Sequence, residues 1–130
     1  MKNSSAGTKR ILLVEDEPGI TQICQRTLTS EGFEVDIAVN GVVAQDMLGE
    51  KDYELVIIDI RTPVMNGKQL YQYIEERYPW LIDGVIFTSG DVISNDIQYF
   101  LKQNGKPFIP KPFTPDELNT TVRETLRGLD

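Results

Sequence analysis

Residues 55–67, with the sequence LVIIDIRTPVMNG, change from an apolar run to a loop at one acidic residue, Asp59. The run at 55–58 is rich in β-branched side chains, which is typical of a central parallel strand covered on both faces. Thr62-Pro63 and Asn66-Gly67 are turn-forming pairs, so a loop is expected before the next helix. Asp59 is therefore predicted to lie at the carboxyl end of a strand, the edge where open α/β sheets bind ligands.

The composition is that of one ordinary globular domain. The chain has 130 residues, 40% of them hydrophobic, and a formal net charge of -7. A negative charge repels nucleic acid phosphates, so we expect no direct binding to nucleic acid. The apolar runs are too short to span a membrane, and the single cysteine, Cys24, cannot form an internal disulfide. We therefore expect a cytoplasmic protein that has no membrane contact, with Cys24 in its core.

Strand and helix patterns alternate along the chain. Short apolar runs predict five strands, at residues 11–14, 33–37, 55–58, 85–87 and 107–109. Apolar residues at helical spacing predict five helices, covering residues 20–28, 43–48, 70–77, 97–101 and 118–129. This order predicts an α/β fold with a doubly wound parallel sheet, because parallel strands need crossover helices. We expect one domain at residues 10–129 after a flexible tail at residues 1–9.

The last helix has the clearest start signal. Thr114 is a suitable N-cap, Pro115 fits the first helical position, and Glu117 completes a capping box. Its predicted buried face extends to Leu129. Trp80, in contrast, follows a helix that must stop before a proline, and we place it in a loop.

Five polar residues are predicted to stand at the carboxyl ends of strands: Glu15, Asp16, Asp59, Thr88 and Lys111. Each has an ordinary explanation as a helix-start charge, a turn residue or a solvated loop cation. Three acids beside one lysine and one hydroxyl are nevertheless a combination that is typical of a functional site. Together they favour a functional site at this edge of the sheet.

The chemistry of such a site follows from its charges. Clustered carboxylates repel one another unless a cation neutralises them, and an all-oxygen site suits Mg²⁺, with Asp16 and Asp59 as ligands. A carboxylate nucleophile, Asp59, can accept a phosphoryl group as an acyl phosphate. Lys111 can neutralise the developing charge, and the Thr88 hydroxyl can bind another phosphoryl oxygen. The chain contains no histidine, so any histidine chemistry must come from a partner.

Four motifs resemble those of a known family, the receiver domains of two-component response regulators, which are also called CheY-like. They are LVEDEP at 13–18, Asp59 followed by PVMNG at 63–67, TSG at 88–90, and KPF at 111–113. The resemblance covers residues 10–129. It implies a flavodoxin-like sheet of five parallel strands in the order 2-1-3-4-5, with five helices.

The resemblance also implies roles at the site. Asp59 is expected to be the phosphoacceptor, assisted by Lys111. Asp16 and Asp59 are expected to bind Mg²⁺ directly, and Glu15 is expected to act through water. Arg61 is at the position whose backbone carbonyl is expected to bind the metal.

The implied function is a signalling switch of a phosphorelay. The phosphodonor is then a histidine on a partner histidine kinase or histidine phosphotransfer protein. Thr88 and Phe108 resemble the switch pair, and a homodimer through the face of the fourth helix, fifth strand and fifth helix is a further implication. Such a domain is not an enzyme, except that it catalyses its own phosphoryl transfer and autodephosphorylation. Residues 108–118 resemble receivers that belong to hybrid sensor kinases, which favours a piece of a larger protein over a stand-alone regulator.

Two other classes of protein are alternatives. An aspartate-nucleophile phosphatase of the haloacid dehalogenase type needs a second Asp two residues after the first, and Arg61 occupies that position. A flavodoxin-like binding module needs a phosphate-binding loop after its first strand. The acids at 15–17 would repel a flavin phosphate there.

Overall fold

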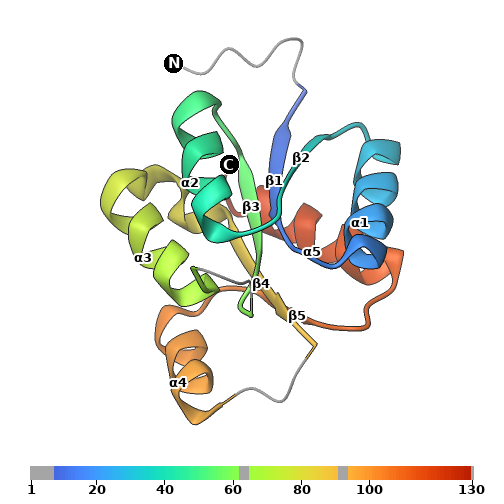
Figure 1. The fold of residues 1–130 in the computed structure, drawn as a ribbon. Helices are drawn as coiled ribbons and strands as arrows, with labels where there is room; N and C mark the ends of the chain where they lie inside the picture. Colours follow the sequence, from blue (N-terminus) through green and yellow to red (C-terminus); the bar gives the residue numbers. More distant parts are fainter. Residues whose placement is uncertain (1–7, 62–64, 91–93, 130) are drawn as a thin grey trace.

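The computed structural model describes residues 8–61, 65–90 and 94–129. Within these ranges the five predicted strands form one parallel sheet in the order β2-β1-β3-β4-β5 (Figure 1). The strands are β1 (Arg10–Val14), β2 (Glu34–Ala38), β3 (Leu55–Asp59), β4 (Val85–Ser89) and β5 (Phe108–Pro110). The α/β fold and its strand order are therefore confirmed. Most of the predicted tail at 1–9, and the Thr62-Pro63 turn, lie outside the described residues.

Five α-helices alternate with these strands. They are α1 (Pro18–Ser30), α2 (Gly41–Glu50), α3 (Gly67–Arg77), α4 (Asn95–Asn104) and α5 (Pro115–Arg127). One expectation was wrong: Trp80 lies in a short 3-10 helix, η2 (Pro79–Gly84), and not in a loop. Pro79 ends α3 as predicted, but it also starts η2, since its fixed φ suits a first helical position.

The helices cover the sheet from two sides, and the alternation of strand side chains separates the two cores. On one face, apolar residues of the strands pack against α2, α3 and α4; these strand residues are Leu12, Val14, Ala38, Val56, Ile58, Val85 and Phe87. On the other face they pack against α1 and α5, through Ile11, Leu13, Val35, Leu55, Ile57, Ile86 and Ile109. Cys24 is fully buried in this second core, as predicted. Successive side chains of a strand point to opposite faces, so both faces of the sheet are covered.

The sequence signals at the start of α5 are confirmed. The Thr114 hydroxyl accepts a hydrogen bond from Glu117 N at 3.1 Å, and Glu117 Oε1 accepts one from Thr114 N at 2.8 Å. Leu118 and Val122 form the buried face of α5, whereas Leu129 is 41% exposed. The buried face therefore ends before Leu129, because α5 itself ends at Arg127.

No helix in the described part of the chain is long and apolar enough to cross a membrane.

Candidate functional site

The site forms where the central strands end, on the α1 and α5 side of the sheet. Asp59 is the last residue of β3 and pairs in register with Thr88 of β4. Asp59 follows Ile57 by two residues, and Thr88 follows Ile86 by two, so both side chains share the face of those core residues. Glu15 follows Leu13 in the same way, directly after β1. The period of two thus brings these three polar side chains to one corner of the sheet.

Lys111 connects three carboxylates at this corner. Its Nζ lies 2.9 Å from Glu15 Oε1, 2.7 Å from Glu17 Oε1 and 2.9 Å from Asp59 Oδ2. Its backbone N–H donates a 3.0 Å hydrogen bond to the carbonyl of Ser89, which extends the pairing of β4 and β5. The lysine is therefore aimed along the carboxyl edge, as predicted.

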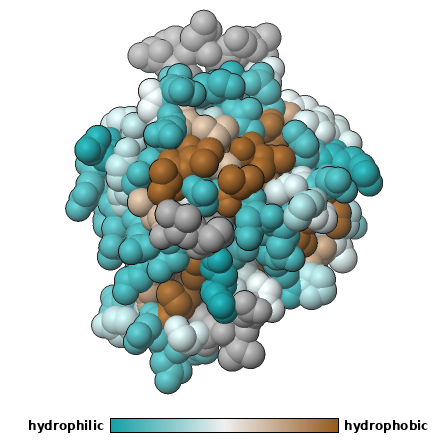
Figure 2. Space-filling view, viewed as in Figure 1, coloured by the Kyte–Doolittle hydropathy of each residue, from teal (hydrophilic) through white to brown (hydrophobic). Residues whose placement is uncertain are grey.

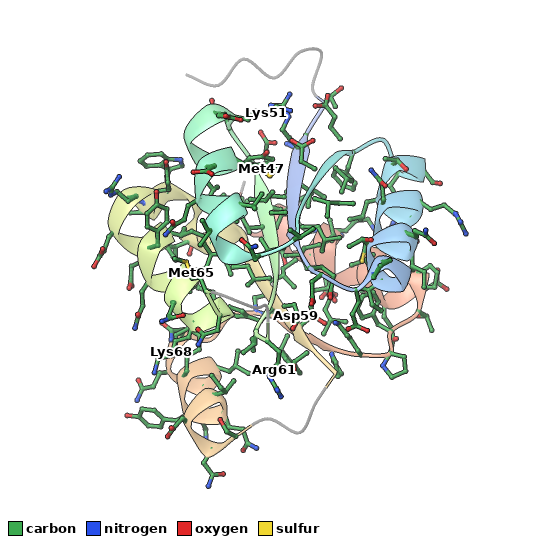
Figure 3. The ribbon with its side chains drawn as sticks, viewed as in Figure 1. Met47, Lys51, Asp59, Arg61, Met65 and Lys68 are labelled. Carbon is green, nitrogen blue, oxygen red and sulfur yellow. The ribbon has the colours of Figure 1, made fainter. Side chains whose placement is uncertain are left out.

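Asp59 is held by two donors on its two oxygens. Oδ2 accepts from Lys111, and Oδ1 accepts a 2.9 Å hydrogen bond from the backbone N–H of Arg61. Figure 3 shows Asp59 and Arg61 at the lower end of β3. Charge-assisted hydrogen bonds of this kind orient a carboxylate. Asp59 is only 4% exposed, so its orientation is well defined.

The loop after Asp59 closes through Gly67. The N–H of Gly67 donates to the carbonyl of Ile60 at 3.0 Å, and a Cβ at Gly67 would lie 2.8 Å from Ile60 Cα. Only glycine allows such an approach of two backbones. Asn66 then caps α3 by accepting from Gln69 N at 2.9 Å. The predicted Asn66-Gly67 turn therefore holds the loop that carries Arg61.

Burial and pairing act on the pKa values of the two buried partners in different ways. Burial, with a further contribution from the Asp59 charge, raises the pKa of Glu15 to about 7, although the hydrogen bond from Lys111 lowers it. For Lys111, burial lowers the pKa, but hydrogen bonds to Glu17, Asp59 and Glu15 outweigh it and leave the pKa raised. Lys111 is thus a permanent cation, whereas burial and the Asp59 charge favour the protonated form of Glu15.

An open cavity of about 520 Å³ lies beside these charges. Its lining residues come from the ends of four strands and the start of α1, and they are Asp16, Glu17, Ile20, Asp59, Arg61, Gly90, Lys111 and Pro112. Asp16 is exposed to this cavity and does not belong to the Lys111 cluster. Asp59 is thus reached from solvent through this cavity.

The donor set suits a hard divalent cation. Carboxylate oxygens of Glu15, Glu17 and Asp59 lie within 4.8 Å of one another. Glu15 Oε1 is buried and accepts no hydrogen bond among the described residues, although Lys111 is close to it. Carboxylates this close together repel one another, and they match the all-oxygen ligands of Mg²⁺. This acidic pocket is therefore consistent with a magnesium site.

Thr88 and Phe108, the predicted switch pair, lie on neighbouring strands. The Thr88 hydroxyl is buried and donates a 2.6 Å hydrogen bond to the carbonyl of Ile109. Phe108 is half-buried and packs at the edge of the core under α2, α3 and α4. The two residues are thus linked through the backbone of β5, and the Thr88 hydroxyl is engaged away from Asp59.

Glu17 is the site residue that sequence reasoning missed. It was interpreted as part of a helix-start charge run, but its side chain makes no cap hydrogen bond to α1 and contacts Lys111 instead. The available signal was its place in the same run of acids as Glu15 and Asp16.

Comparison with known proteins agrees with the family resemblance found in the sequence. Residues 11–123 match the model of the response regulator receiver domain. The chain is 36% identical over 117 residues to the response regulator Rre1 of Synechocystis, covering 89% of this chain and 51% of that protein. It is 32% identical to the sensor kinase CckA of Brucella abortus, covering 96% of this chain and 13% of that protein. The chain thus spans about half the length of Rre1 and a smaller part of CckA.

A solved structure agrees with the sequence matches. The CheY-like receiver domain protein of Methanospirillum hungatei superposes with a TM-score of 0.85 at 28% identity, covering 94% of this chain and 96% of that one. The fold, the acidic pocket and the family match cover the same part of the chain. The chain therefore belongs to the family of response regulator receiver domains of two-component signalling.

Proposed function

We propose that the domain accepts a phosphoryl group on Asp59 from a phosphohistidine of a partner histidine kinase or histidine phosphotransfer protein, and that this modification switches its signalling state. The observation that carries the proposal is the placement of Asp59. Its carboxylate is fixed between Arg61 N and Lys111 Nζ, beside an open cavity that contains further acids. A positioned carboxylate with a neighbouring cation is the arrangement that nucleophilic attack on phosphorus requires.

The proposed step balances without any further reactant. An Asp59 oxygen forms a bond to phosphorus while the phosphorus–nitrogen bond breaks. The electron pair of that bond stays on the imidazole, which leaves as a neutral ring because its other nitrogen carries a proton. Lys111 stabilises the negative charge on the phosphoryl oxygens, and the backbone N–H of Arg61 keeps the carboxylate aligned. The partner must supply the histidine, since the chain has none.

Mg²⁺, when bound, neutralises the charge shared between the acids and the phosphoryl group. We propose Asp16, Asp59 and the backbone carbonyl of Arg61 as its protein ligands, with Glu15 acting through water. The exposed position of Asp16 in the cavity supports a direct role. The buried ion pair of Glu15 with Lys111 supports an indirect one.

A phosphoramidate salt, which mimics the phosphorus–nitrogen bond of phosphohistidine, tests the donor chemistry. Incubation of the full chain with phosphoramidate and Mg²⁺ should add one phosphate, detected by intact mass. Addition of a chelator should prevent the reaction. Modification that proceeds equally with the chelator would contradict the metal-assisted mechanism.

A further inference from the structure

Glu17 is the only loosely held member of the Lys111 cluster. The side chains of Glu15, Asp59 and Lys111 are 0%, 6% and 8% exposed, whereas that of Glu17 is 62% exposed. The Glu17 backbone, in contrast, is fixed. Its N–H donates to Glu15 Oε2 at 3.2 Å, and its carbonyl accepts from Thr21 N at 3.0 Å. The Glu17 carboxylate can therefore swing into solvent without disturbing the start of α1.

The hydrogen-bond capacity of Lys111 is fully used. A lysine ammonium has three donors, and Glu15, Glu17 and Asp59 each accept from Lys111 Nζ. Modification of Asp59 frees the donor that its own carboxylate accepts, so a second phosphoryl oxygen can bind Lys111 only if another carboxylate releases its donor. The Glu15 side chain is fully buried. Glu17 is the member that can leave.

We infer that Glu17 is a positioning residue. Its carboxylate accepts a hydrogen bond from Lys111 Nζ until a phosphoryl oxygen on Asp59 accepts that hydrogen bond instead. This inference rests on the proposed function. Glu17 holds the ammonium over the cavity before reaction, at 2.7 Å, and competes with the phosphoryl oxygens for it afterwards. It acts through Lys111 and does not need to touch the reacting atoms.

The strength of this competition follows from exposure. Exposed ion pairs contribute little, and their loss corresponds to about a two- to fivefold change in an equilibrium constant. Glu17→Gln removes the charge of the side chain, and Glu17→Asp keeps the charge but shortens the side chain by one methylene. Both variants should therefore release Lys111 and tighten the binding of a phosphoryl analogue. The effect should be larger for Glu17→Gln.

Beryllofluoride, which stands in for the phosphoryl group, is the probe. The full-length chain and its variants are titrated with it at saturating Mg²⁺, and the amide signals of Asp59 and Gly90 are followed by NMR. Magnesium affinity is measured separately, so that a change in metal binding is not taken for a change in analogue binding. Glu34→Gln is the matched control, because Glu34 forms an exposed ion pair with Arg10 at 2.9 Å on β2, away from the site.

The expected result is tighter analogue binding in both Glu17 variants, by about two- to fivefold for Glu17→Gln, and no change in Glu34→Gln. Tightening in Glu17→Gln alone would reflect general charge repulsion and would overturn the inference. Unchanged or weaker binding in both Glu17 variants would overturn it as well. Failure of the wild-type chain to bind the analogue at all would instead contradict the proposed function.

Discussion

The hydroxyl of Thr88 donates a 2.6 Å hydrogen bond to the main-chain carbonyl of Ile109, across the pairing of β4 and β5. Thr88 is also the register partner of Asp59 on its other side. The Thr88 side chain therefore lies between β3, which carries Asp59, and β5, which carries Phe108. If the hydroxyl turns toward a phosphoryl oxygen on Asp59, its bond to Ile109 breaks, and the packing of Phe108 against the core changes with it.

Substitution of Phe108 by alanine tests whether this residue transmits the change. Beryllofluoride should perturb the amides of residues 97–102 and 118–122 in the wild-type chain, because Phe108 moves inward into volume that Thr88 vacates. In Phe108→Ala the analogue should still bind near Asp59, while the distant shifts fall below about half of their wild-type size. The measurement is a set of two-dimensional amide spectra.

Thr88→Val is the matched variant, because it keeps the shape of the side chain and removes only the hydroxyl. It should retain analogue binding at Asp59 and lose the distant shifts as Phe108→Ala does. Distant shifts of full size in both variants would show that neither residue carries the signal.

Metal binding should distinguish the two adjacent acids. Asp16→Ala removes a proposed direct ligand and should weaken Mg²⁺ by at least about tenfold, whereas Glu15→Gln should weaken it less. Titration followed by amide shifts is the suitable measurement, because the exposed Trp80 precedes β4 at the opposite edge of the sheet. A larger loss in Glu15→Gln than in Asp16→Ala would mean that the two roles are reversed.

Phe100 anchors α4 to the rest of the domain. It is the only buried residue that α4 contributes, and its ring lies 5.4 Å from that of Tyr71 and 5.6 Å from that of Phe87. Lys68 Nζ lies 5.8 Å from the ring of Phe100 on the outer side. Phe100→Ala should therefore lower the free energy of unfolding by about 3 kcal/mol, measured by urea denaturation.

Tyr99→Ala is the control for this prediction, since Tyr99 is 65% exposed on the same helix. It should change the free energy of unfolding by less than about 0.5 kcal/mol. Equal losses in the two variants would show that α4 is not anchored by Phe100.

Figure 2 shows exposed apolar residues gathered in patches among polar ones. Among the described residues, the large exposed hydrophobic side chains include Val39 and Val42, which flank the start of α2.

The fold was predictable because its signals are local and repeated. Apolar runs, turn pairs and helical spacing alternate in a regular order, and parallel strands bring their carboxyl ends to one edge. The convergence of Glu15, Asp59 and Lys111 followed from that order alone. The register then explains why Thr88 joins them.

The features that the sequence does not predict depend on side-chain torsions and on where the helices end. The acids at 15–17 form one run, but only the structure shows that Glu17 turns to Lys111 and Asp16 to the cavity. Pro79 marks the end of α3, but a proline suits both a loop and a first helical position, so it does not by itself predict the 3-10 segment that follows. Leu129 continues the helical spacing of α5 beyond the last turn of that helix.

Chemical mapping of the modified residue tests the central claim most directly. The chain is treated with phosphoramidate and Mg²⁺, reduced with borohydride, which converts an aspartyl phosphate to homoserine, and digested for tandem mass spectrometry. We predict homoserine at position 59 in the wild-type chain, and none at any position in Asp59→Asn. Homoserine at another acidic position, or equal phosphate incorporation into Asp59→Asn, would contradict the assignment of Asp59 as the phosphoacceptor.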